Sequence, residues 1–150
     1  VLKQVKAMPL AGMRGVRLFV SKPVVEDGKD IDFNLSALRN SVELRLRNVG
    51  LEVRAQDDQS KPLYPALDVG VRILRLKGAA DGIVVWETRV CVQEGVNLMR
   101  DPKVCGLAST WENLSFGTVA ESNFDKPVRD QLLDQVDAFL NSYLIANPKK

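Results

Sequence analysis

Residues 66–77 read Ala-Leu-Asp-Val-Gly-Val-Arg-Ile-Leu-Arg-Leu-Lys, and their alternation of apolar and polar side chains decides the fold class. Leu67, Val69 and Val71 alternate with small or polar residues, which is the two-residue period of a strand with one buried face. The period shifts near residues 73–74, and we expect a β-bulge or a local twist there. A sheet that buries one face needs helices on that face, so the flanking sequence has to supply them.

Four more segments have strand character. They are bounded by proline, glycine and acidic residues, which favour turns. We expect a loose amino-terminal arm before the first of them and a loop after it. The arm is 1–14, the strands are 15–21, 51–56, 83–93 and 104–114, and the loop is 24–34.

An amphipathic helix is predicted over residues 35–49. Apolar side chains recur there at helical spacing, and Gly50 stands at the usual stop position. Either Asn34 or Ser36 can cap the start, because both carry a side-chain oxygen that accepts a hydrogen bond from the first turn.

The carboxyl-terminal segment gives the clearest helix in the sequence. Asp125 can act as its N-cap, and Pro127 fits the first turn. A broad apolar face runs through residues 128–144, and the pair Asn147-Pro148 ends the helix.

The element order is therefore β-α-β-β-β-β-α. This order predicts an α+β fold of two layers, in which a mixed five-stranded sheet carries both helices on one face. No linker or repeat divides the 150 residues, so we expect a single domain over 1–150.

The two cysteines give a structural prediction. If 83–93 and 104–114 form a hairpin around 97–100, Cys91 faces Cys105, Arg89 faces Leu107 and Val85 faces Trp111. Facing cysteines are close enough for a disulfide, and a disulfide indicates an exported protein. The alternative is a pair of reduced thiols.

Composition excludes several classes of function. The chain has 21 basic and 19 acidic residues, a net charge of +2, which does not indicate nucleic acid as a partner. It has no histidine, so His-dependent catalysis and His-based zinc sites are absent, and no motif calls for a cofactor. No run of 18 apolar residues marks a transmembrane segment.

Two pairs of residues leave alternatives open. Glu87 and Glu112 can be a catalytic carboxylate pair or ordinary surface charges. Trp86 and Trp111 lie on neighbouring predicted strands, where they can stack a ligand or simply pack in the core.

The helices offer two candidate docking patches for a protein partner. On the first helix, an exposed leucine opposite the apolar face sits among arginines, like an apolar anchor in a charged rim. On the last helix, three aspartates form an acidic stripe. Ordinary solvated surface is the alternative for both, and the amino-terminal arm can also cover the leucine. The candidate residues are Leu44, Arg39, Arg47, Asp130, Asp134 and Asp137.

The chain also carries a resemblance to a known group. Thr110-Trp111 in a strand, Gly117-Thr118-Val119 at a turn and the pattern Asp-x-Phe-x-Asn-x-Tyr-x-x-Ala-Asn-Pro at 137–148 resemble uncharacterised exported bacterial envelope proteins. The element order is similar to that of the amino-terminal domain of the translocation protein TolB and of the curli-secretion lipoprotein group. The resemblance implies a cleaved signal peptide and a periplasmic location, and none of its motifs is catalytic.

The sequence thus favours a non-catalytic, exported envelope protein. Its first residue is Val1, which fits removal of a signal peptide or an arbitrary boundary. We expect a protein-interaction module or an accessory subunit of a larger assembly, with another envelope protein as its partner. The alternative is a small hydrolase-type enzyme with an unrecognised carboxylate or cysteine centre.

Overall fold

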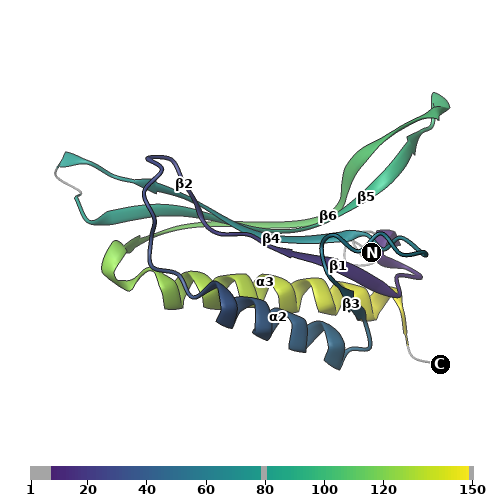
Figure 1. Cartoon of the computed structure of the whole chain (residues 1–150), viewed down its shortest axis with the longest axis horizontal. Coiled ribbons are helices and arrows are strands. Elements are labelled where there is room, and N and C mark those ends of the chain that lie inside the picture. Colours follow the sequence, from purple (N-terminus) through teal and green to yellow (C-terminus); the bar gives the residue numbers. More distant parts are fainter. Residues whose placement is uncertain (1–7, 79–80, 149–150) are drawn as a thin grey trace.

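The computed structural model describes residues 8–78 and 81–148, which form a sheet with both helices on one face (Figure 1). The layers are those of the predicted α+β fold, and the element order matches the prediction. Among the described residues, no helix lies on the opposite face of the sheet (Figure 1).

The sheet has six strands, one more than predicted. The strand order is β3-β1-β4-β5-β6, and β2 pairs with β4 within the segment expected to be a loop. Because β1 runs parallel to β3 and β4 while β4, β5 and β6 form an antiparallel meander, the sheet is mixed. The strands are β1 (Gly15–Val20), β2 (Val24–Val25), β3 (Glu52–Arg54), β4 (Ala66–Arg75), β5 (Ile83–Leu98) and β6 (Asp101–Ala120).

Helix α2 (Leu35–Asn48) forms where its periodicity predicts it. Asn34 is the cap, since its Oδ1 accepts a hydrogen bond of 3.0 Å from the Ala37 N–H, a contact of the kind that stabilises a helix start. The chain leaves the helix through Gly50, whose φ of 90° suits glycine. The residues facing the sheet are Leu38, Val42 and Leu46.

Helix α3 (Asp125–Ala146) does not start as predicted. Its N-cap is Phe124, because the 3₁₀ turn η3 (Glu121–Asn123) already winds the chain before Asp125. The Asp125 carboxylate instead accepts a hydrogen bond of 2.7 Å from the Asn34 N–H, so the predicted cap joins the starts of the two helices.

The core lies between the helices and the covered face of the sheet. Trp111 meets Phe139 of α3 edge-to-face, with ring centroids 5.4 Å apart, and Trp86 lies against Gly117. A Cβ at position 117 would overlap the Trp86 ring, which is why glycine is required there. Both tryptophans are buried members of the core cluster, which supports the packing interpretation.

The amino-terminal arm is not loose in the part that the structure describes. Leu10, the last residue of the 3₁₀ turn η1 (Met8–Leu10), is fully buried. Asn147 clamps this stretch, since its amide donates to the Leu10 carbonyl at 2.8 Å and accepts from the Gly12 N–H at 2.7 Å. The prediction over 1–7 lies outside the described residues.

The bulge predicted at 73–74 is absent. Strand β4 pairs with β5 in one unbroken register from Ala66, which faces Gln93, to Arg75, which faces Val84. The apparent shift in period arises because Leu74 is an apolar residue that points to the uncovered face.

The predicted register of the β5–β6 hairpin is wrong. Its tip is at 99–100, and β6 leaves residues 102–104 and 110 without a counterpart on β5. These extra residues shift the pairing, so Arg89 faces Leu114 and Val85 faces Thr118. The tip forms an arm that projects from the sheet (Figure 1).

The predicted disulfide is therefore not formed. Cys91 faces Glu112, and Cys105 faces Asn97 near the tip of the arm. This offset places the cysteines roughly 20 Å apart along the strands, far beyond the reach of a disulfide. Both are free thiols.

Candidate functional site on the uncovered face of the sheet

Three large apolar side chains lie exposed on the face of the sheet opposite the helices. Phe116 is 67% exposed, Val24 60% and Leu74 42%. A single exposed apolar residue is ordinary, but these three come from β6, β2 and β4 and line one hollow. The fold brings them together from distant parts of the chain.

The hollow has a volume of about 280 Å³ and continues into a second hollow of about 180 Å³. Gly70, at a position without a side chain, helps to form the second one. Arg72 and Glu87, which face each other across β4 and β5, line both hollows together with Val24. The surface is thus an apolar trough that carries charges of both signs. We call it the sheet trough, defined by Val24, Leu74, Phe116, Arg72 and Glu87.

A charged cluster borders the trough on the same face. The Arg89 Nε donates to Glu112 at 2.7 Å, and a terminal nitrogen donates to the Ser109 hydroxyl at 3.2 Å. Partial burial raises the pKa of the neighbouring Asp68 carboxyl, an effect that the charge of Arg89 opposes. Arg89 therefore interacts with two carboxylates, that of Glu112 through a hydrogen bond and that of Asp68 through its charge.

This cluster does not assemble the parts of a catalytic centre. Burial raises the pKa of the Cys91 thiol, which favours the neutral, weakly nucleophilic form. Glu87 on β5 faces Phe116 and Glu112 on β6 faces Cys91, so the two glutamates are offset by four residues, roughly 13 Å along the strands. The Glu112 carboxylate pairs instead with Arg89. Among the described residues, no three His, Cys, Asp or Glu side chains gather to hold a metal ion.

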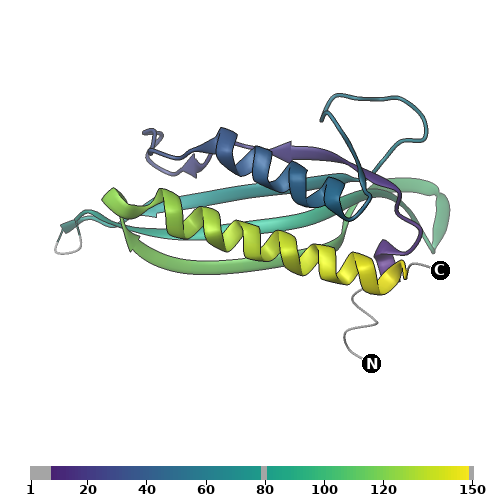
Figure 2. The same cartoon turned by 90° about the horizontal axis from the view of Figure 1, so that it is seen from below.

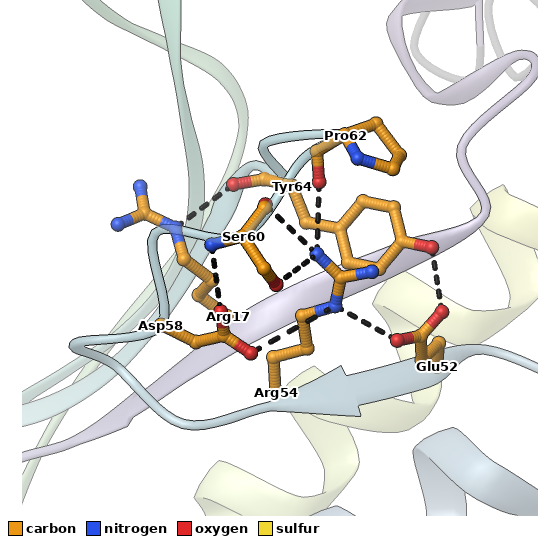
Figure 3. Close-up of polar contacts among 7 residues, drawn as sticks. All are labelled: Arg17, Glu52, Arg54, Asp58, Ser60, Pro62 and Tyr64. Carbon is orange, nitrogen blue, oxygen red and sulfur yellow. Dashed lines mark hydrogen bonds and ion pairs between the residues drawn. The ribbon is translucent and has the colours of Figure 1, made fainter.

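A second polar cluster surrounds Arg54 at the other end of the sheet (Figure 3). The Arg54 guanidinium stacks on the Tyr64 ring at 4.0 Å and donates to Glu52 at 2.8 Å. It also donates to the carbonyls of Ser60 and Pro62 at 3.0 and 2.9 Å. The guanidinium thereby holds the loop between β3 and β4 in place.

This Arg54 cluster is structural in character. The Tyr64 hydroxyl donates to Glu52 at 2.6 Å, and its ring packs where Gly15 leaves room. The hydrogen bond from Tyr64, together with that from Arg54, lowers the pKa of the Glu52 carboxyl. Arg54, Tyr64 and Glu52 are thus hydrogen-bonded to one another and to the loop, which favours a structural role.

The docking residues predicted on the first helix lie on the outer surface of α2. Leu44 is 61% exposed, and Arg39 is half-buried. Arg47 is paired with Glu43 at 2.6 Å, one turn earlier in the helix. Leu44 therefore stands as an exposed leucine beside an ion pair.

The predicted acidic stripe on α3 is partly neutralised. Asp130 pairs with Lys126 at 2.6 Å, and Asp137 pairs with Arg45 of α2 at 3.0 Å. Asp134 is exposed to solvent. The stripe is thus less strongly acidic than its sequence indicates.

The apolar residues of the trough were missed because the sequence was interpreted by element. The sequence predicts Leu74 within a bulge or twist and Val24 in a loop, and Phe116 lies beyond the predicted end of its strand. One signal was present: Leu74 breaks the polar side of an otherwise regular alternation.

A comparison with models of protein families finds no match, and a comparison with curated proteins finds none either. None of the described helices is both long and apolar enough to cross a membrane.

Proposed function

We propose that this chain is a non-catalytic protein-interaction module or accessory subunit of a larger envelope assembly, which binds another protein through the sheet trough. The observation that carries the proposal is the exposed group Val24, Leu74 and Phe116 around one hollow. Exposed apolar surface rimmed by charge is typical of protein interfaces.

The chemistry of the trough favours a particular kind of partner surface. An apolar side chain of the partner would enter between Leu74 and Phe116, and its charged neighbours would meet Arg72 and Glu87. Such an arrangement derives affinity from the apolar contact and orientation from the charges.

The proposed setting in the cell envelope rests on the resemblance at 110–148. The disulfide between Cys91 and Cys105 no longer supports it, since both thiols are free. The enzyme alternative is less favoured. Asp68 and Glu112 flank Cys91 on the neighbouring strands, but burial raises the pKa of that thiol and Arg89 pairs with Glu112.

The test is recovery of the partner from a native envelope fraction by the purified chain, followed by mass spectrometry. We expect Leu74→Asp to abolish recovery while the melting temperature changes little. Leu44→Asp is the matched control, since Leu44 is also exposed but lies on the helical layer. If Leu44→Asp abolishes recovery and Leu74→Asp does not, the partner binds the helices and the trough proposal is wrong.

A further inference from the structure

The outer edge of β6 is a long strand edge without a strand partner among the described residues, and the turn η1 lies beside part of the strand. Strand β6 ends the sheet order and pairs with β5 along its inner side. Figure 2 shows it as the lower border of the sheet, beyond α3. Backbone N–H and C=O groups that point away from β5 are available to pair with another extended strand.

The two edges of the sheet differ in length and charge. At the opposite edge, β3 has three residues, two of them the charged Glu52 and Arg54. Short, charged edge strands resist pairing with other chains. In contrast, residues 104–120 of β6 contain no proline and one charged residue, Glu112, whose carboxylate is held by Arg89 at 2.7 Å. The β6 edge therefore lacks the short length and the several charged side chains that usually prevent an edge strand from pairing with another chain.

Apolar side chains line this edge on the uncovered face. Leu114 is 46% exposed and Phe116 67%. On the helical side, α3 presents the small residues Ala138 and Ser142 to a hollow of about 360 Å³ beside Trp111. This hollow leaves room next to the edge for the α3 of a second copy.

We propose that two copies of this chain form a twofold dimer by antiparallel pairing of their β6 edges, with Ser115 facing its counterpart. In this register Leu114 of each copy meets Phe116 of the other, so the exposed apolar side chains cover one another. Glu112 faces Thr118, and no like charges are opposed. Both helical layers then lie on the same face of one continuous sheet.

The first test measures the mass of the purified chain by sedimentation equilibrium over the micromolar range. We expect twice the mass of the single chain. Leu114→Lys places a charge at the edge and should weaken the dimer at least tenfold, whereas Leu44→Lys, the same change on α2, should leave it intact. A wild-type chain that stays monomeric, or a dimer that survives Leu114→Lys, overturns the proposal.

The second test reports the register by disulfide cross-linking. In a Cys105→Ser background, Ser115→Cys should form a covalent dimer on oxidation, since directly facing Cα atoms lie within disulfide range. Thr118→Cys is the control, because in this register it is offset from its counterpart by six residues. Absence of the Ser115→Cys dimer, or equal yields for both variants, contradicts the register.

The dimer goes beyond the proposed binding function. The two proposals share Phe116, which belongs to the sheet trough and also lies at the β6 edge, but they can fail separately. The cross-linking and mass measurements use the purified chain alone. Partner recovery is tested with Leu74→Asp on β4, which is two strands away from the β6 edge.

Discussion

Cys91 and Cys105 lie on the same hairpin and have opposite surroundings. Cys91 is buried, and burial raises its pKa, whereas Cys105 is exposed on the projecting arm. Thiol-specific reagents require access and thiolate, so the two cysteines should differ sharply in reactivity.

Labelling with a maleimide, read by intact mass, checks this difference. We expect one label on the folded chain, at Cys105, and two labels after unfolding without reductant. If the unfolded, unreduced chain takes up no label, the disulfide predicted from the sequence exists and the hairpin register of the structure is wrong.

Glu52 gives the fold a dependence on acid pH. The Tyr64 hydroxyl and the Arg54 guanidinium lower the pKa of this carboxyl below its ordinary value of 4.5. The charged form is therefore favoured in the folded state. Its stabilising contribution is present above pH 4.5 and is lost as the pH falls through the lowered pKa.

Glu52→Gln should consequently lower the melting temperature at neutral pH, with a difference from the wild type that narrows below pH 4.5. Thermal unfolding across a pH series measures this. Tyr64→Phe keeps the ring and removes one hydrogen bond, so it should show the same trend with a smaller amplitude. A difference that stays constant through the acid range would mean that Glu52 titrates normally.

At the scale of elements, α3 is held by its apolar face. Phe139 is fully buried against Trp111, whereas Ile145 on the same helix is 50% exposed. Phe139→Ala removes a ring from a packed core and should cost about 3–5 kcal/mol of unfolding free energy.

Urea unfolding of Phe139→Ala and Ile145→Ala separates the effect of burial on stability from the effect of helix propensity. Ile145→Ala should change stability by less than about 0.5 kcal/mol, because exposed substitutions have small effects. Similar losses for the two variants would show that the cost does not come from the packing of α3 on the sheet.

Elements were predicted more reliably than their pairing. The periodicity of residues 35–49 and 66–75 depends on which side faces the core, a property of each segment by itself. The β5–β6 register depends on how many residues of β6 stay unpaired, and the alternation of 104–114 does not reveal that number. A shift in pairing was enough to remove the predicted disulfide.

At the scale of the whole molecule, packing is concentrated at the centre of the sheet. Strands β1, β4 and the first half of β5 lie against the helices, whereas residues 101–107 on the arm are all exposed. Local opening is easiest where few buried contacts hold the backbone.

Hydrogen exchange should therefore divide the hairpin into two parts. We expect amides of residues 84–92 to exchange slowly, with the global stability of the fold, and amides of 94–108 to exchange much faster. Mass spectrometry of peptides from the exchanged protein resolves the two regions. Equal protection along the hairpin would contradict a weakly held arm.

The sequence by itself determined the α+β class, the element order and the exposure of Leu44, because each follows from local periodicity and charge. For Trp86 and Trp111, it also favoured packing in the core over a role in a binding site. Only the tertiary structure decided which residues share a surface. Val24, Leu74 and Phe116 are far apart in the chain and meet because β2, β4 and β6 join one sheet with one face left uncovered. Strand pairing is a long-range property. Local patterns therefore could not predict the separation of Cys91 from Cys105 or the β6 edge that the described residues leave unpaired.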